Sequence, residues 1–298
     1  MQSELPKKRT SLLKAKSSKL KAIVVIYHKG CNDGFGAAWS AWKKFGNKAE
    51  YLGEEHGRPV PKNLKNKDVY IIDFGYSLED TKKILKDALS LTVIDHHISA
   101  RQVIQTVPNH IYDNNRSGAT LAWRYFHPRK PIPKLLEYIE DSDLWKFKLR
   151  NTKEIISSAN LYPFDFKVWD KIGKEMENKI KIKKYIQNGK VIRRYEEKII
   201  EKAIYRSNLV RFEGYDAIAA NSSVLTSEIG NALVKIKPPI SIIFSQIHGR
   251  KIVSLRSNGK VDVSKIAAKY GGGGHYAAAG FHLELNEPYP WKVIKPMN

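Results

Sequence analysis

The chain has 298 residues, of which 42% are hydrophobic and 28% charged, which is enough for two domains of ordinary size with separate cores. Its single cysteine, Cys31, excludes an intramolecular disulfide and favours a reducing compartment, and without a signal-peptide core or an apolar run near ~18 residues we expect a cytoplasmic protein with no membrane partner. The net charge of +22 favours nucleic acid or another polyanion as partner, although lysine-rich surfaces can also serve only to solubilise a protein.

The N-terminal half alternates strands and helices after a basic tail. Residues 1–20 are rich in Lys and lack apolar periodicity, so we expect them to be disordered. Apolar runs predict strands at residues 22–26, 69–72 and 91–94. Helices are expected at residues 35–45, 77–89 and 117–126. This alternation predicts an α/β domain over residues 21–160, with a mostly parallel sheet and helices on both faces.

The C-terminal half begins with a helical linker. Residues 171–206 contain twelve basic and five acidic residues, with Ile and Tyr at helical spacing, and we expect two helices there that bridge the two domains within a linker over residues 161–205. Residues 206–298 are expected to form a smaller α/β domain. Its predicted elements are strands at residues 216–220, 240–247 and 251–256, a helix at residues 263–269 and a glycine-rich loop.

Carboxylates and imidazoles follow the first three predicted strands. The first strand leads to His28 and Asp33, the second to Asp73, and the third to Asp95-His96-His97. The carboxyl ends of parallel strands meet at one edge of the sheet, where α/β folds build their sites. Oxygen and nitrogen donors gathered there are what a divalent metal centre requires.

These segments also carry a family resemblance. In order along the chain, they and three later segments are similar to the DHH phosphoesterase superfamily, in the subgroup with a C-terminal DHH-associated domain. The later segments are Asp141 within Ile-Glu-Asp-Ser-Asp-Leu-Trp, Arg256-Ser257, and the glycine run 271–274 with His275. The resemblance covers about residues 22–290. Relatives include short-oligonucleotide hydrolases, single-strand exonucleases, cyclic-dinucleotide phosphodiesterases and pyrophosphatases.

The resemblance implies a two-metal site, usually for two Mn²⁺, with Mg²⁺ as the alternative. It implies that Asp73 bridges both ions, that Asp33, His96 and Asp141 complete one shell, and that His28 binds the other ion. Asp143 competes with Asp141 for this role, and the family spacing favours Asp141. His97, oriented by Asp95, is implied as a catalytic contact to the phosphate. The implied substrate-binding residues are Arg256, Ser257, Gly272, Gly273, Gly274 and His275.

The first motif departs from the family pattern at Cys31. Many relatives have two aspartates, two residues apart, and Cys31 stands where the first of them would fall, two residues before Asp33. Sulfur ligation, a water molecule or a weakly bound ion could each follow. We expect water to fill the place, because thiolate is a soft ligand for manganese.

The leading function is therefore metal-dependent hydrolysis of phosphodiester bonds in short oligonucleotides or single-stranded nucleic acid. The alternatives are a cyclic-dinucleotide phosphodiesterase, a pyro- or polyphosphatase, and a catalytically weakened relative that binds nucleic acid. The segment Arg116-Ser117-Gly118 could face substrate or only cap a helix, and a homodimer is left open.

Overall fold

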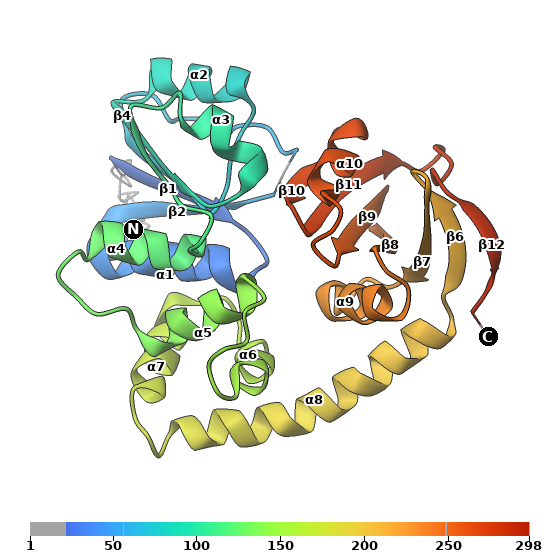
Figure 1. Ribbon diagram of the computed structural model, residues 1–298. Helices are drawn as coiled ribbons and strands as arrows, with labels where there is room; N and C mark the ends of the chain where they lie inside the picture. Colours follow the sequence, from blue (N-terminus) through green and yellow to red (C-terminus); the bar gives the residue numbers. More distant parts are fainter. Residues whose placement is uncertain (1–21, 56, 248, 298) are drawn as a thin grey trace, which may run out of the picture.

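Two β-sheets organise the part of the chain that the structure, a computed structural model, describes: residues 22–55, 57–247 and 249–297. The expected basic tail, residues 1–20, lies outside these ranges. In Figure 1 the two sheets form separate domains that are joined at the bottom by a long helix. Within the described residues, no helix combines the length and the apolar character that a membrane span needs.

The N-terminal sheet has five strands in the order β2-β1-β3-β4-β5, and all neighbouring pairs are parallel. The strands are β1 (Ile23–His28), β2 (Ala49–Glu54), β3 (Asp68–Ile72), β4 (Ser90–Asp95) and β5 (Asn109–Tyr112). The expected parallel sheet is confirmed, and β2 and β5 extend it at the two edges, where short and partly polar runs gave a weaker signal.

Helices cover both faces of this sheet, as expected. One face packs on α1 (Asn32–Phe45) and α4 (Gly118–Phe126), and the other on α2 (Leu78–Asp87) and the short α3 (Arg101–Ile104). Along β1, Val24 and Ile26 point to the second face and Val25 to the first, and all three are fully buried. Burial on both faces explains why the strands read as continuous apolar runs rather than alternating ones.

The helical region between the sheets contains one bridging helix rather than the expected two. Its helices are α5 (Lys134–Asp143), α6 (Thr152–Ala159), α7 (Phe166–Met176) and α8 (Ile182–Tyr205). Trp169, Ile172 and Met176 bury α7 in the aromatic core that α1 and α5 also build, so α7 belongs to the first domain. Of these helices, α8 alone extends from the first domain to the second, where its Ile200 and Ile204 pack.

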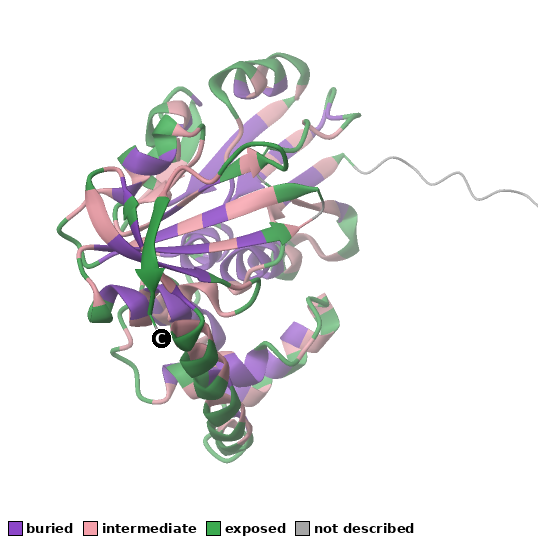
Figure 2. Cartoon of the chain, turned by 90° about the vertical axis from the view of Figure 1, so that its right-hand side faces the viewer, coloured by how far each residue is buried: buried purple, intermediate pink, exposed green. Residues whose placement is uncertain are grey.

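The C-terminal sheet has seven strands in the order β10-β11-β9-β8-β7-β6-β12. These are β6 (Asn208–Phe212), β7 (Tyr215–Asn221), β8 (Ile240–Ile247), β9 (Arg250–Ser257), β10 (Gly273–His275), β11 (Ala278–Glu284) and β12 (Lys292–Pro296). Only β7 and β8 pair in parallel, across α9 (Thr226–Ile236), and α10 (Val263–Lys269) covers the opposite face. Figure 2 shows the edge strand β12 exposed along its length.

The glycine run is partly a strand and not only a loop. β10 pairs antiparallel with β11 and brings this edge of the second sheet against the first domain. A Cβ at Gly272 would lie 2.1 Å from the carbonyl oxygen of Gly280, and Gly274 has a φ of 139°. These glycines therefore permit a close approach of two backbones that no larger residue would allow.

Candidate metal centre

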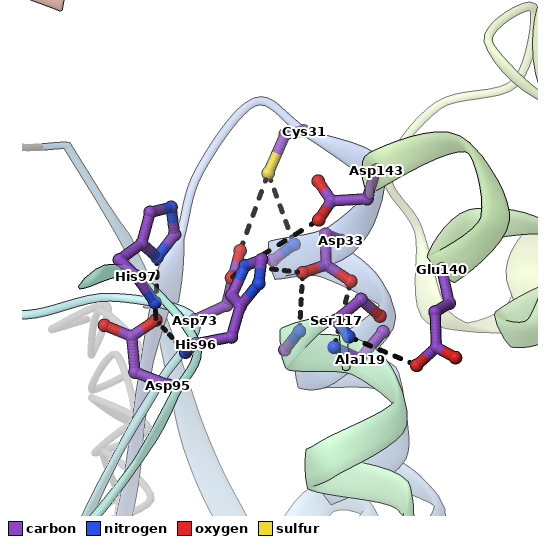
Figure 3. Close-up of polar contacts among 12 residues, drawn as sticks. Cys31, Asp33, Asp73, Asp95, His96, His97, Ser117, Ala119, Glu140 and Asp143 are labelled. Carbon is purple, nitrogen blue, oxygen red and sulfur yellow. Dashed lines mark hydrogen bonds and ion pairs between the residues drawn. The ribbon is translucent and has the colours of Figure 1, made fainter. Parts of the chain in front are cut away.

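Side chains from four separate elements meet beyond the carboxyl ends of the central strands. Figure 3 shows Cys31, Asp33, Asp73 and Asp143 directed toward one another around His96. Cys31 and Asp33 come from the start of α1, Asp73 directly follows β3, Asp143 ends α5, and His96 directly follows β4. The parallel sheet thus gathers the acidic and imidazole groups at the edge where the sequence pattern placed them.

Asp73 lies at the centre of this site and is almost completely buried. Its Oδ1 is 3.2 Å from Nε2 of His96, while its Oδ2 is 3.8 Å from Nδ1 of His28 and 3.8 Å from Sγ of Cys31. The two oxygens of one carboxylate therefore face two different groups of potential ligands. This is the arrangement that a carboxylate bridging two cations requires.

The first ligand group contains Asp33, Asp73, His96 and Asp143. Nε2 of His96 is 3.5 Å from Oδ2 of Asp33 and 3.7 Å from Oδ2 of Asp143, in addition to its contact with Asp73. Three carboxylates that converge on one nitrogen repel one another unless a positive charge stands between them. Three hard oxygens and an imidazole fit Mn²⁺ or Mg²⁺.

The electrostatics of this group reflect the crowding of like charges. Burial, followed by the charge of Asp73, raises the pKa of Asp33 well above its usual range. Burial alone would lower the pKa of His96. Hydrogen bonding with Asp73 and the nearby carboxylate charges, that of Asp33 first among them, outweigh burial and raise this pKa to about 10. Without a cation, a proton on His96 therefore offsets part of the negative charge of the surrounding carboxylates.

The N-terminus of α4 holds Asp33 in place. The backbone N–H groups of Gly118 and Ala119 donate to the two oxygens of Asp33 at 2.7 and 3.0 Å. A Cβ at Gly118 would lie 2.5 Å from the Cβ of Asp73, so only glycine lets α4 approach both aspartates. Ser117 caps α4, with its side chain accepting from Thr120 N–H. The segment 116–118 thus supports the site from behind.

Glu140 anchors the same segment and was not singled out from the sequence. Its carboxylate accepts from Nη1 of Arg116 at 2.9 Å and from the backbone N–H of Ser117 at 3.2 Å, and the hydroxyl of Thr120 also donates to it. Arg116 is therefore engaged inside the first domain. A Glu on the inner side of a helix was the only signal in the sequence.

The structure does not bring Asp141 to the ligand groups, in contrast to the expectation from family spacing. One oxygen of Asp141 accepts from Lys148 N–H at 2.8 Å, and the other accepts from Leu149 N–H at 3.0 Å and from the Thr152 hydroxyl at 2.5 Å. Both oxygens are thereby committed to the loop that follows α5. Asp143, two residues on, reaches His96 instead.

The second ligand group contains His28, Cys31 and Asp73, whose ligand atoms all lie within 4.8 Å of one another. Sγ of Cys31 is 3.4 Å from Nδ1 of His28 and also accepts the N–H of Gly34 at 3.2 Å. Burial, together with the charges of Asp73 and Asp33, raises the pKa of the Cys31 thiol well above its usual range. The sulfur of Cys31 therefore lies beside both His28 and the outer oxygen of Asp73.

A cluster of histidines lies beside the carboxylates and spans both domains. Nδ1 of His97 is 2.7 Å from Oδ1 of Asp95, which also accepts the N–H of His96 at 2.7 Å. The ring of His275 stacks on that of His97 at 4.6 Å and lies 4.8 Å from that of His96. Gly274 N–H donates to Oγ of Ser99 at 3.2 Å, a first-domain contact that no sequence motif indicated.

The surroundings act in opposite directions on the protonation of His97 and His275. Burial opposes protonation of His97, but the charge and hydrogen bond of Asp95 raise its pKa. Burial, followed by the charges of His97 and His96, lowers the pKa of His275 to about 3. The surroundings therefore favour the protonated form of His97 and the neutral form of His275.

The two neighbouring residues Arg256 and Ser257 have different roles. Arg256 lies on the same face of the second sheet as His275, whereas Ser257 is buried. Arg256 in β9 pairs with Ala278 in β11, which in turn pairs with His275 in β10, so all three side chains share one face of the sheet. Nη2 of Arg256 donates to Oγ of Ser227 at 2.8 Å. Ser257 is buried and its hydroxyl donates to the carbonyl of Val261 at 2.7 Å, so it stabilises a turn.

The chain is similar to several known proteins. Residues 216–289 match the DHHA1 domain. The chain is 32% identical over 283 residues to the uncharacterized protein R106 of Acanthamoeba polyphaga mimivirus, covering 86% of this chain and 66% of that protein. It is 25% identical over 221 residues to the oligoribonuclease NrnB of Bacillus subtilis, covering 63% of this chain and 51% of NrnB. The chain thus spans less than two thirds of the length of both relatives.

The same fold is found in a solved structure of RecJ from Thermus thermophilus in complex with Mn²⁺. Its TM-score is 0.52 at 13% sequence identity, and the match covers 88% of this chain and 49% of RecJ. At this identity the likeness concerns the arrangement of the two sheets and their connecting helices.

Proposed function

Because the chain belongs to the DHH phosphoesterase superfamily, we propose that it hydrolyses phosphodiester bonds in short oligonucleotides or single-stranded nucleic acid, using a pair of divalent cations. Asp73 is the observation that carries this proposal. Its two oxygens face two separate ligand groups, beside histidines contributed by both domains.

Manganese or magnesium fits the first ligand group, in which Asp33, Asp143 and His96 would hold one ion with Oδ1 of Asp73. His28 and Oδ2 of Asp73 would hold the other ion. Such a pair of cations lowers the pKa of a water molecule and offsets the charge of the phosphate. Asp143 replaces Asp141 in this assignment, because both oxygens of Asp141 are bonded to the backbone and to Thr152.

The histidines would receive the phosphate of the substrate. The pair with Asp95 fixes the ring of His97 and favours its protonated form, so it can donate to a phosphate oxygen on which charge builds during hydrolysis. His275 would donate from the other side of the same space, and Arg256 extends this face along the second sheet, with only the small side chain of Ala278 between them.

The position of His275 supports a single-stranded substrate. Its ring stacks on that of His97 of the other domain at 4.6 Å, so the two domains are in contact beside the ligand groups, and a wide, stiff duplex would not be accommodated there. The net charge of +22 favours a substrate with several phosphates. The name of the relative NrnB, an oligoribonuclease, points to the same class of substrate.

The test is cleavage of an end-labelled five-nucleotide RNA by the full chain with Mn²⁺, in parallel with a duplex, a cyclic dinucleotide and pyrophosphate. We expect rapid cleavage of the single strand alone. Asp73→Asn should abolish cleavage and Mn²⁺ binding together, because both ions depend on this carboxylate, while Asp87→Asn on the exposed side of α2 should change neither.

His275→Ala should reduce turnover by about two orders of magnitude, the scale of one lost charge-stabilising contact, and leave Mn²⁺ binding intact. Faster hydrolysis of pyrophosphate, of the cyclic dinucleotide or of the duplex would replace the proposed substrate by that compound. Full activity of Asp73→Asn would exclude the two-cation site.

A further inference from the structure

The sulfur of Cys31 lies at the second ligand group, beside His28 and the outer oxygen of Asp73. We propose that Cys31 binds the second cation directly and that this pocket takes a borderline ion such as Zn²⁺, Co²⁺ or Fe²⁺, while the carboxylate-rich pocket takes Mn²⁺ or Mg²⁺. This inference rests on the proposed two-cation site. It replaces the expectation that a water molecule fills the place of the missing aspartate.

The distances within the group match a single ion held by three protein atoms. Sγ of Cys31 is 3.4 Å from Nδ1 of His28 and 3.8 Å from Oδ2 of Asp73, and the last two atoms are 3.8 Å apart. A tetrahedral zinc ion with bonds of ~2.3 Å to sulfur and ~2.0–2.2 Å to nitrogen and oxygen separates its ligands by ~3.4–3.6 Å. Shifts of a few tenths of an ångström would complete the site.

The donor atoms of the two groups differ in chemical softness. The first group offers carboxylate oxygens from Asp33, Asp73 and Asp143 with one imidazole, whereas the second offers one nitrogen, one sulfur and one oxygen. Hard oxygen donors suit Mg²⁺ and Mn²⁺, and thiolate with imidazole suits zinc and its borderline neighbours. The bridging carboxylate of Asp73 would therefore join two unlike ions.

Helix capping offers a simpler role for Cys31. The residue is the N-cap of α1, and its sulfur accepts the N–H of Gly34 at 3.2 Å. Capping does not require sulfur, however, because Ser, Thr, Asp and Asn are the preferred residues at this position. A metal binds the thiolate form, so Cys31 would release its proton on binding a cation, because burial and the charges of Asp73 and Asp33 favour the neutral thiol in the metal-free protein.

The experiment uses the fact that Cys31 is the only cysteine of the chain, so that any thiol signal reports this residue alone. The metal-free full chain is titrated with Co²⁺ while the thiolate-to-cobalt charge-transfer absorption is recorded. In parallel, the rate of alkylation by iodoacetamide is measured with Zn²⁺, with Mg²⁺ and without metal. We expect the charge-transfer band to appear and Zn²⁺ but not Mg²⁺ to protect the thiol.

Two variants separate ligation from capping. Cys31→Ser keeps a good N-cap and should leave the unfolding midpoint of the metal-free protein unchanged, yet it should lose the band and weaken Co²⁺ binding at one site more than about 100-fold, beyond the effect of losing an outer-shell partner. Cys31→Asp supplies a hard oxygen and should shift the preference of this site toward Mn²⁺.

The outcomes distinguish this inference from the proposed function. If two Co²⁺ ions bind without the band and the thiol stays reactive, Cys31 is not a ligand although the two-cation site stands. If no ion binds to the wild-type chain, the two-cation site itself is excluded. A Cys31→Ser variant that binds Co²⁺ as tightly as the wild type would reduce Cys31 to a helix cap.

Discussion

At Asp73 the backbone turns left-handed, with a φ of 52°, directly after β3. An ordinary residue pays about 1–3 kcal/mol for such a conformation, which persists only where the surroundings enforce it. Here the N–H of Asp73 donates to the carbonyl of Ile94 at 2.9 Å, and Gly118 leaves room for its side chain. This conformation lets one carboxylate face both ligand groups.

Asp141 and Asp143 should respond differently to substitution. Asp141→Asn puts an amide where a carboxylate accepts two N–H groups and a hydroxyl, so we expect a loss of about 1–3 kcal/mol in unfolding free energy. Asp143→Asn, at a partly exposed residue, should leave stability nearly unchanged but weaken Mn²⁺ binding. Urea unfolding without metal and calorimetric titration with Mn²⁺ measure the two effects.

The opposite pattern, in which Asp141→Asn removes an ion and Asp143→Asn only destabilises the fold, would restore Asp141 as the ligand.

His96 should make the metal-free protein sensitive to pH. Its pKa rises from about 6.5 in an unfolded chain to about 10 in the folded site. A raised folded pKa stabilises the protein fully below the unfolded value, and this contribution disappears as the pH rises through the folded value. The difference in unfolding free energy between the wild type and His96→Gln, measured with a chelator present, should therefore shrink between about pH 6.5 and about pH 10.

A difference between the two proteins that is constant or grows over this pH range would show that His96 is not protonated in the metal-free site.

At the scale of elements, the start of α4 links the two aspartates to the sheet. Its first two N–H groups bind the carboxylate of Asp33, where the helix dipole favours a negative charge. Its first residue, Gly118, also passes within van der Waals contact of Asp73. The position of one helix end thus sets the distance between two proposed ligands.

Gly118→Ala should disturb this arrangement. The new Cβ would lie 2.5 Å from the Cβ of Asp73 and 2.6 Å from its Oδ1, so α4 or Asp73 must move. We expect Mn²⁺ affinity to fall at least about tenfold, as it does when residues that orient ligands are changed. Gly173→Ala is the matched control, because its Cβ would meet the ring of the buried Trp39 at 3.2 Å and Leu135 at 3.9 Å, away from the site.

Calorimetric titration of both variants with Mn²⁺ makes the comparison. Equal affinities in Gly118→Ala and Gly173→Ala would show that the approach of α4 to Asp73 does not shape the site.

At the scale of the whole molecule, the second domain adds His275 to a site whose proposed cation ligands all lie in the first domain. α8 packs closely on α6, where a Cβ at Gly189 would lie 1.8 Å from the carbonyl oxygen of Glu154, and its far end packs on the second domain. With this connection in place, β10 lies against the first domain, where Oγ of Ser99 accepts the N–H of Gly274. His275 thereby reaches histidines more than a hundred residues earlier in the chain.

Salt should weaken the binding of RNA, because Arg256 and His275, on one face of the second sheet, would contact its phosphates. The Asp73→Asn variant, which should bind but not cleave, allows the affinity for a labelled five-nucleotide RNA to be measured by fluorescence anisotropy. A single strand loses about 0.7 in the log–log slope for each neutralised phosphate, so a slope of up to about −3 is expected for four phosphates.

Adding Arg256→Gln to this variant should weaken binding and flatten the slope, whereas Arg250→Gln, at an exposed position of the same strand paired with Glu284, should not. Binding that does not depend on salt, or equal effects of the two arginine substitutions, would show that the face shared by Arg256 and His275 does not hold the phosphates.

The amino-acid sequence was sufficient to predict the three central strands of the first sheet, although not its edge strands β2 and β5, and the meeting of His28, Asp33, Asp73 and His96. Continuous apolar runs predict buried parallel strands. The carboxyl ends of parallel strands lie at one edge of the sheet, regardless of the loops that connect them. The side chains that follow those strands are therefore brought together by local pattern alone.

The tertiary structure decided what depends on contacts between distant segments. Asp141 and Asp143 lie at the same helix end and have the same chemistry, and only the loop that closes on Asp141 separates their roles. Part of the glycine run became β10 because it pairs with β11 at a distance only glycine permits. The spacing of Cys31 from His28 was visible in the sequence, but its approach to Asp73 follows from the packing of β1 on β3.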